Sequence, residues 1–153
     1  FLDALPCMLH VRKEEKASLS ILSTVCIFER GQLFCAFPPC PALGQLSFSH
    51  DFVYVIISGE VKLLGALGSN DRRLVMEPHT DLSLSAGNRA VHSMLGGRMC
   101  AIATLGPQTC IIGDLLAKNP DSRWCLQPSY KQVQVLLVPR TEWAAALGPE
   151  VIP

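Results

Sequence analysis

The sequence predicts a mainly β domain with a short helical segment at each end. The strongest β signal lies over 52–64, which is rich in valine, isoleucine and tyrosine. Two further apolar stretches, 99–105 and 133–138, have the length and composition of buried strands. Leucines at helical spacing predict an N-terminal helical segment over 1–23, and a capped apolar segment predicts a C-terminal helix over 140–148.

Length, composition and charge restrict the class of protein. The 153 residues are one domain's worth of chain, and 49% apolar residues are enough for a packed core. The 13 basic and 13 acidic side chains balance, so no basic face for nucleic acid is expected. No apolar run approaches the roughly 18 residues of a membrane span, so we expect no direct membrane insertion. The chain begins with Phe1, which we interpret as the start of a piece of a longer protein.

Seven cysteines are scattered along the chain without a Cys-x-x-Cys pair. Most of them stand in apolar, strand-like contexts, where cysteine behaves as a small buried hydrophobe. An odd number and an irregular spacing favour free thiols over a disulfide framework. We therefore expect a reducing compartment and a cytoplasmic location. The seven are Cys7, Cys26, Cys35, Cys40, Cys100, Cys110 and Cys125.

Local patterns predict the elements of the N-terminal half. Residues 13–22 place charges first and bring Leu19 and Leu22 to one face, which predicts a short helix. Residues 24–28 and 32–37 are rich in apolar and aromatic side chains and are separated by a short turn. They are predicted to be two consecutive strands.

Three features organise the chain from residue 52 onward. Ser58-Gly59 interrupts the 52–64 signal and predicts a hairpin. The stretch over about 65–99 is rich in glycine and predicts an elaborated pair of loops with short strands at most. Thr141 is a favourable N-cap and predicts helical turns over 142–147.

One stretch in this part of the chain carries a candidate anion site. Gly113 and Asp114 open it, and Arg123 follows the acid nine residues later. A helix that starts here would direct backbone N–H groups around Leu115 and Leu116 at an anion. The carboxylate would accept hydrogen bonds from a sugar hydroxyl, and the guanidinium would pair with a phosphate. The pattern is suited to a small cyclic phosphate.

This stretch resembles the phosphate-binding cassette of cyclic nucleotide-binding domains. In that family the cassette reads phenylalanine-glycine-glutamate, an apolar triplet, a short spacer and proline-arginine-alanine. Gly113 matches the family glycine, Asp114 the glutamate and Arg123 the arginine. Ser122 stands where the family usually has proline.

Two further stretches resemble the same family, in the same order along the chain. Residues 51–61 are similar to its strand-turn-strand that ends in serine-glycine-glutamate-valine, and 135–143 to its last strand running into a helix. The resemblance implies an antiparallel β-roll or jelly roll over 24–139, with an insertion at about 65–99. All of 1–153 is then a single cyclic nucleotide-binding-like domain.

The cassette also departs from the family pattern. Asp114 is one methylene shorter than glutamate, so its carboxylate reaches about 1.5 Å less. Trp124 and Cys125 replace small residues after the arginine, and the indole has two possible roles: stacking on a purine or filling the pocket. Asp114 is equally suited to capping a helix, and Arg123 to a structural ion pair.

The resemblance implies a regulatory module that binds cAMP or cGMP and performs no catalysis. Its partners would be the nucleotide and either other domains of the parent protein or a protein partner. The alternative is a degenerate form of the fold that binds no nucleotide and serves as a structural or protein-docking domain. The expected ligand-binding residues are Gly113, Asp114, Leu115, Leu116, Ser122, Arg123, Trp124 and Cys125.

Metal and enzyme sites have weaker support in the sequence. Cupins share a β-roll and bind metal through a His-x-His pair, but His50 is followed by Asp51 and has no second histidine two residues away. No nucleophile elbow or phosphate-binding Walker loop is present. We therefore expect no catalytic residues, no metal and no cofactor beyond a nucleotide ligand.

Overall fold

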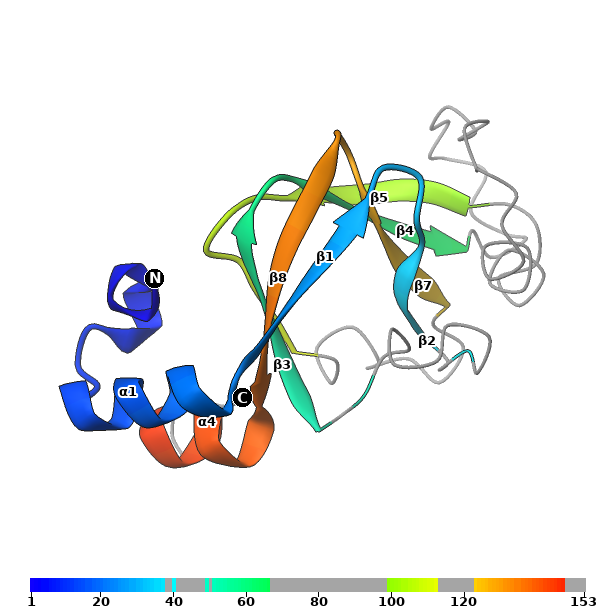
Figure 1. Cartoon of the computed structure of the whole chain (residues 1–153). Coiled ribbons are helices and arrows are strands. Elements are labelled where there is room, and N and C mark those ends of the chain that lie inside the picture. The colour runs from blue at the N-terminus through cyan, green and yellow to red at the C-terminus, as the bar shows by residue number, and fades with distance from the viewer. Residues whose placement is uncertain (38–39, 41–48, 50, 67–98, 113–122, 148–153) are drawn as a thin grey trace.

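Two four-stranded antiparallel sheets pack against each other, and the helices gather at one end (Figure 1). Residues from both sheets share one buried cluster, which forms the interior of the roll. The computed structural model of the chain describes residues 1–37, 40, 49, 51–66, 99–112 and 123–147.

The strands follow a nested pairing order. The first sheet has the order β1-β8-β3-β6 and the second β2-β7-β4-β5, so β1 pairs with β8, β2 with β7, β3 with β6 and β4 with β5. This pairing of the first half of the chain with the second is that of a jelly roll, which confirms the predicted antiparallel roll. The strands are β1 (Thr24–Glu29), β2 (Phe34–Phe37), β3 (Phe52–Ser58), β4 (Val61–Ala66), β5 (Met99–Leu105), β6 (Cys110–Ile111), β7 (Trp124–Pro128) and β8 (Gln132–Pro139).

The predicted hairpin over 52–64 is wrong, although both of its strands exist. β3 lies between β8 and β6 in one sheet, and β4 lies between β7 and β5 in the other. Each strand therefore has both edges occupied, and Ser58-Gly59 carries the chain from one sheet to the other. Gly59 has a φ of +85°, and an added Cβ would lie 2.6 Å from the Gln132 carbonyl oxygen. The turn signal specified a glycine turn but could not specify which sheet each strand joins.

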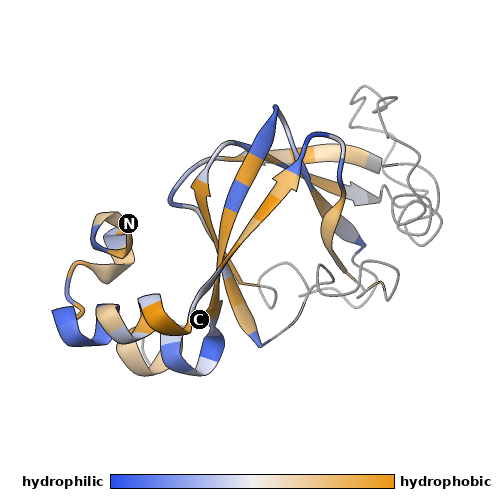
Figure 2. Ribbon diagram, viewed as in Figure 1, coloured by the Kyte–Doolittle hydropathy of each residue, from blue (hydrophilic) through white to orange (hydrophobic). Residues whose placement is uncertain are grey.

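Alternation along the strands of the first sheet gives it two buried faces. In β3, Tyr54 and Ile56 face the interior of the roll, whereas Val53 and Val55 face the helices. Figure 2 shows the apolar stretches along these strands, with hydrophilic residues at the turn before β8. We call the interior set the roll cluster: Phe28, Phe34, Cys35, Tyr54, Ile56, Val61, Leu63, Ile111, Trp124, Leu126, Val133 and Val135.

The second buried set lies between the first sheet and the helical segments, and we call it the helix cluster. Side chains from the N-terminal turns, α1 and α4 meet the outer face of β3 and β8 there. The helical elements are two 3-10 turns (Leu2–Ala4 and Pro6–Met8), α1 (Lys13–Leu22) and α4 (Arg140–Leu147). The helix cluster consists of Leu2, Leu5, Met8, Val11, Leu19, Val53, Val55, Leu136, Val138 and Trp143.

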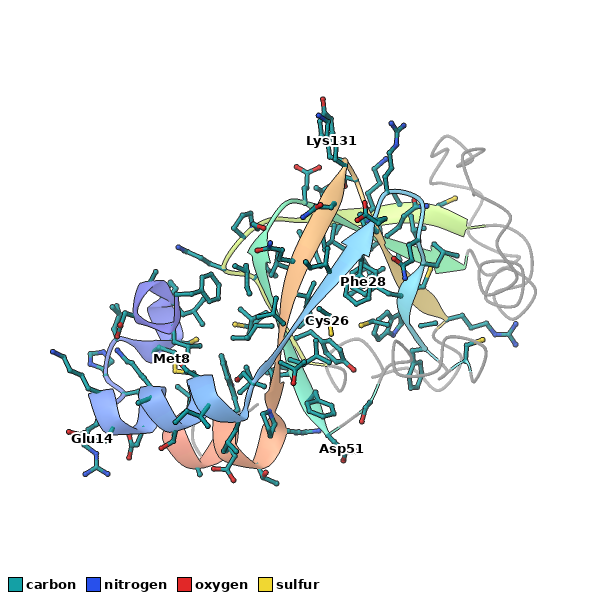
Figure 3. All side chains as sticks on the ribbon, in the orientation of Figure 1. Met8, Glu14, Cys26, Phe28, Asp51 and Lys131 are labelled. Atoms are coloured by element: carbon teal, nitrogen blue, oxygen red, sulfur yellow. The ribbon has the colours of Figure 1, made fainter. Side chains whose placement is uncertain are left out.

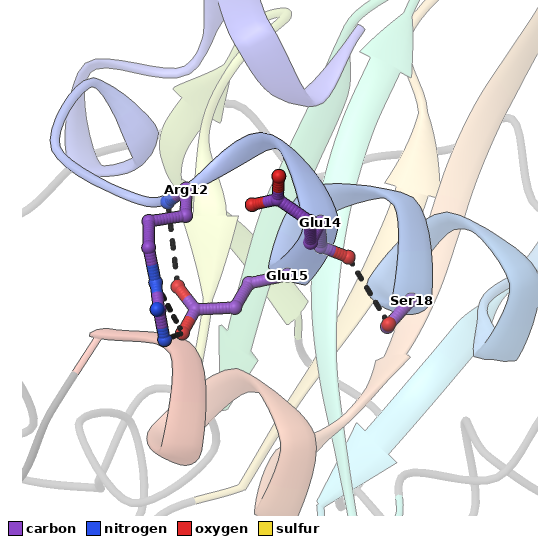
Figure 4. Close-up of polar contacts among 4 residues, drawn as sticks. All are labelled: Arg12, Glu14, Glu15 and Ser18. Carbon is purple, nitrogen blue, oxygen red and sulfur yellow. Dashed lines mark hydrogen bonds and ion pairs between the residues drawn. The ribbon is translucent and has the colours of Figure 1, made fainter.

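Helix α1 has the bounds that the sequence predicts. At its start the Glu15 carboxylate accepts hydrogen bonds from the Arg12 guanidinium at 2.6 Å and from the Arg12 N–H at 3.3 Å (Figure 4). One turn further, the Ser18 hydroxyl donates to the Glu14 carbonyl oxygen at 3.1 Å. Of the two leucines that the helical spacing placed on one face, Leu19 is buried and Leu22, in the last turn, is 50% exposed.

The C-terminal helix begins at Arg140, the first residue of the predicted 140–148 segment, so the predicted N-cap at Thr141 is wrong. Strand β8 runs directly into α4, which begins at Arg140. The Arg140 N–H donates to the Asp51 carbonyl oxygen at 2.7 Å, across from the pairing of Phe52 with Pro139. This tertiary contact holds the start of the helix, and Thr141 is an exposed residue of the first turn.

The predicted strand over 32–37 and the predicted insertion over 65–99 agree in part with the structure. Strand β2 begins at Phe34, two residues later than the predicted 32–37. The predicted insertion over 65–99 begins and ends on paired strands, because Ala66 of β4 is the partner of Met99 of β5. Its central part, 67–98, lies outside the described residues.

Candidate functional site

The predicted cassette connects the two sheets. Before it, Ile111 of β6 pairs with Tyr54 in the first sheet. After it, Trp124 of β7 pairs with Phe37 and Gly65 in the second sheet. Five of the predicted ligand-binding residues lie outside the described part of the chain: Gly113, Asp114, Leu115, Leu116 and Ser122.

Trp124 is a member of the roll cluster. Its side chain is 3% exposed, and its ring stacks on Phe37 with centroids 6.1 Å apart and an angle of 14° between the planes. The two rings come from neighbouring strands in direct register. In this arrangement the indole fills space inside the roll, one residue after the arginine expected to hold the phosphate.

Arg123 and Cys125 lie on either side of this tryptophan and differ in burial. Arg123 precedes the strand and is exposed. Cys125 is fully buried, and burial raises the pKa of its thiol to about 12. The side chain of Cys125 is therefore neutral at physiological pH, which leaves Arg123 as the described residue of the predicted site that carries charge.

Polar chemistry inside the roll is provided by neutral groups. The Tyr54 hydroxyl accepts a hydrogen bond from the Ser49 N–H at 2.8 Å and is hydrogen-bonded to the Cys35 thiol. Burial raises the pKa of Tyr54 and, together with the neighbouring Cys26, that of Cys35. Figure 3 shows Cys26 and Phe28 within the roll and Lys131 on the turn before β8, pointing away from it.

The described interior offers no counter-charge to an anion. Among the described residues the only buried side chain classed as polar or charged is Gln127, which is 6% exposed. A phosphate buried without paired charge would be strongly unfavourable. The described interior of the roll is therefore not suited to a nucleotide phosphate.

The structure shows the state of the cysteines and the grouping of possible metal ligands. All seven cysteines are free thiols, as predicted. Within the described ranges no three histidine, cysteine or acidic side chains are grouped closely enough to hold a metal ion. His50, which we considered for a cupin-type site, is outside those ranges, and Asp51 is exposed.

None of the helices that the structure describes is both long enough and apolar enough to span a membrane.

Comparison with known proteins identifies the fold. No protein-family model matches the sequence, and no curated protein matches it either. Solved structures do match. The regulatory subunit of a cAMP-independent protein kinase A from Trypanosoma brucei has a TM-score of 0.60 at 17% identity, over 97% of this chain and 41% of that one.

Two other solved structures also match the chain. The regulatory domain of Toxoplasma gondii PKA, in a co-crystal with cAMP, has a TM-score of 0.56 at 10% identity, over 95% of this chain and 41% of that one. The catabolite activator protein of Thermus thermophilus has a TM-score of 0.51 at 16% identity, over 93% of this chain and 49% of that one. This chain thus spans less than half of each of these proteins. It has the β-roll fold of cyclic nucleotide-binding domains.

Proposed function

We propose that this chain is a structural or protein-docking domain that keeps the cyclic nucleotide-binding fold and has closed the pocket with its own indole. The observation that carries this proposal is the burial of Trp124 in the roll cluster, stacked on Phe37. In the family that the cassette resembles, a small residue follows the arginine and leaves room for ligand. Here that room is taken by the largest side chain available.

The surface of the roll supports a docking role. Strand β1 is at the edge of the first sheet, and its outward side chains Val25 and Ile27 are each 53% exposed. Just before it, Ile21 and Leu22 at the end of α1 are 82% and 50% exposed. An edge strand with apolar outward side chains is suited to an extended protein segment that adds a strand to the sheet. The partner would be another domain of the parent protein or a separate protein.

A thermal-shift titration of the 153-residue chain with cAMP, cGMP and guanosine tests the closed pocket. A ligand at 100 times its Kd stabilises by about 2.7 kcal/mol, which corresponds to roughly 5–10 °C in Tm for a chain of this size. We expect no shift at about 1 mM nucleotide, the concentration at which a Kd of about 10 μM would give that effect. A saturable shift with any of the three would contradict the proposal.

A variant that opens the pocket makes the test sharper. Trp124→Ala removes the indole, and we expect it to lower stability by about 3–5 kcal/mol while allowing a nucleotide-dependent shift that the parent chain lacks. Trp124→Leu is a milder variant should the alanine variant fail to fold. Phe37→Leu is the matched control, because it removes the stacking partner and leaves the indole in place.

The second candidate function is binding of cAMP or cGMP as a regulatory module. It is favoured by the position of Arg123, exposed at the start of β7 directly after the cassette-like stretch. The co-crystal of the Toxoplasma gondii domain with cAMP supports the same function for the fold. If the parent chain binds nucleotide, Arg123→Ala should weaken affinity by several kcal/mol because a phosphate would lose its counter-charge. Arg30→Ala, an exposed arginine on the β1–β2 turn, is the control.

A further inference from the structure

Two cysteines that are distant in sequence meet beside the helix cluster. Cys7 lies in the 3-10 turn over Pro6–Met8 and Cys110 in β6, and their thiols are hydrogen-bonded to each other. Both are partly buried, and both pack against the same set of apolar side chains. The contact therefore joins the N-terminal helical segment to the first sheet.

Both sulfur atoms are carried by well-anchored backbone. Leu5 and Met8, on either side of Cys7, are 0% exposed, and the Met8 N–H donates to the Leu5 carbonyl oxygen at 2.9 Å. Cys110 is the direct partner of Val55 in β3, itself 0% exposed. Since both backbones are fixed by packing, the two thiols remain neighbours in the folded chain rather than meeting by chance.

We propose that Cys7 and Cys110 form a site of reversible oxidative modification, at which hydrogen peroxide converts the thiol pair into an intramolecular disulfide. The Cys7 sulfur attacks the peroxide O–O bond, forms a sulfenic acid and releases the first water. The Cys110 sulfur then attacks the Cys7 sulfur, so that the S–S bond forms, the S–O bond breaks and the second water leaves. One peroxide thus accepts the two electrons that the two thiols lose.

The order of the two steps follows from the surroundings of Cys110. Burial, and then the neighbouring Cys7, raise the pKa of the Cys110 thiol to about 12. A thiol of high pKa has little thiolate to attack peroxide first. Cys110 is therefore the resolving thiol, which reacts once a sulfenic acid has formed next to it.

Formation of the bond would connect the N-terminal helical segment covalently to β6. It closes a loop of about 100 residues, and cross-links of long loops restrict the unfolded chain most strongly. The oxidised chain should therefore unfold at a higher temperature than the reduced chain.

The test is peptide mapping of the 153-residue chain after treatment with hydrogen peroxide. Remaining thiols are blocked with N-ethylmaleimide, the chain is digested without reductant, and linked peptides are identified by mass spectrometry. We expect one linked pair that contains Cys7 and Cys110, its loss on treatment with dithiothreitol, and a higher Tm before that treatment. Cys7→Ser and Cys110→Ser should each abolish the linked pair and the Tm difference.

Cys26→Ser is the matched control, because Cys26 is also partly buried but lies on β1, outside the pair. It should retain both the linked peptide and the Tm difference. Three results would overturn the proposal: a disulfide between other cysteines, oxidation of Cys7 without linkage to Cys110, or a pair that stays reduced while other thiols are oxidised. The unsubstituted 153-residue chain is enough to distinguish these outcomes, so the test does not depend on the folding of a variant.

Discussion

The roll cluster and the helix cluster lie on opposite faces of the same sheet, yet their side chains differ in chemistry. The helix cluster is aliphatic apart from Trp143, with thiols only at its margin. The roll cluster contains a phenol, a thiol and an indole among its buried members, through Tyr54, Cys35 and Trp124. The buried side chains of the helix cluster therefore contribute packing, and the thiols lie at its margin. The roll cluster contains polar atoms among its buried members, and we propose that Trp124 fills the space that a ligand would need.

The largest expected effect comes from removing the aromatic anchor on each side. Trp143→Ala and Trp124→Ala should each lower the free energy of unfolding by about 3–5 kcal/mol, because both indoles are nearly fully buried. Chemical denaturation measures the loss. A nucleotide titration distinguishes the two variants, because only Trp124→Ala is expected to gain binding. Equal behaviour of the two variants in that titration would mean that the two clusters do not differ as we propose.

The crossing between the two sheets should be the next most sensitive point. In Gly59→Ala the alanine would have to keep the positive φ of Gly59, and its Cβ would lie only 2.6 Å from a backbone oxygen of β8. We expect a loss of about 2–4 kcal/mol from the left-handed conformation and the overlap together. Gly106→Ala is the matched control, since no atom lies within 4 Å of its added Cβ, and it should change stability little. A neutral Gly59→Ala would show that the crossing relaxes easily.

Alkaline pH should destabilise the fold through a buried thiol. Burial raises the pKa of Cys125 from 9.0 to about 12, so the folded chain holds this proton more tightly than the unfolded chain. The stability from this group is complete below pH 9.0 and is lost as the pH rises from 9.0 toward about 12. Over this range the free energy of unfolding should fall by about 1.4 kcal/mol per pH unit because of this group.

Denaturation at several pH values measures this slope, and Cys125→Ala should reduce it while leaving the stability difference constant below pH 9.0. A variant whose alkaline slope equals that of the parent chain would exclude Cys125 as the cause. Cys110, whose pKa is also raised to about 12, provides the comparison on the helix side of the sheet.

The smallest effect is expected on the outer face of β1. Ile27 is 53% exposed, whereas the next residue, Phe28, is 1% exposed and belongs to the roll cluster. Ile27→Lys should therefore change stability by no more than about 0.5 kcal/mol, whereas Phe28→Ala should cost about 3–5 kcal/mol. Thermal unfolding distinguishes the two. A large loss in Ile27→Lys would place this side chain in the core and remove the proposed docking surface.

Much of the fold could be predicted from local sequence. The charged start and the leucine spacing of 13–22 gave the bounds of α1, and the apolar runs gave β3, β4, β5 and β8. Strand β7 was missed: all five residues from Trp124 to Pro128 are buried, so no alternation marks them, and a proline ends the run. Its first residues, Trp124 and Cys125, belong to the stretch that resembles the cassette.

For the candidate site, the sequence supplied Arg123 as a charged residue at the end of a cassette-like stretch, and its phosphate role stays a prediction. It also left two roles open for Trp124, stacking on a ligand or filling the pocket. Which space an indole occupies depends on Phe37, a residue 87 positions earlier, and on the register that brings the two rings together. No local pattern carries that information.

The sequence by itself determined most of the extended segments, the helical segments and the glycine turn at Ser58-Gly59, because these follow from side-chain periodicity and backbone preference within a few residues. The tertiary structure alone decided that β3 and β4 lie in different sheets, that Thr141 lies within α4 and does not cap it, and that Trp124 lies inside the roll. Each of these depends on which strand edges are already occupied and on contacts between residues far apart in the chain.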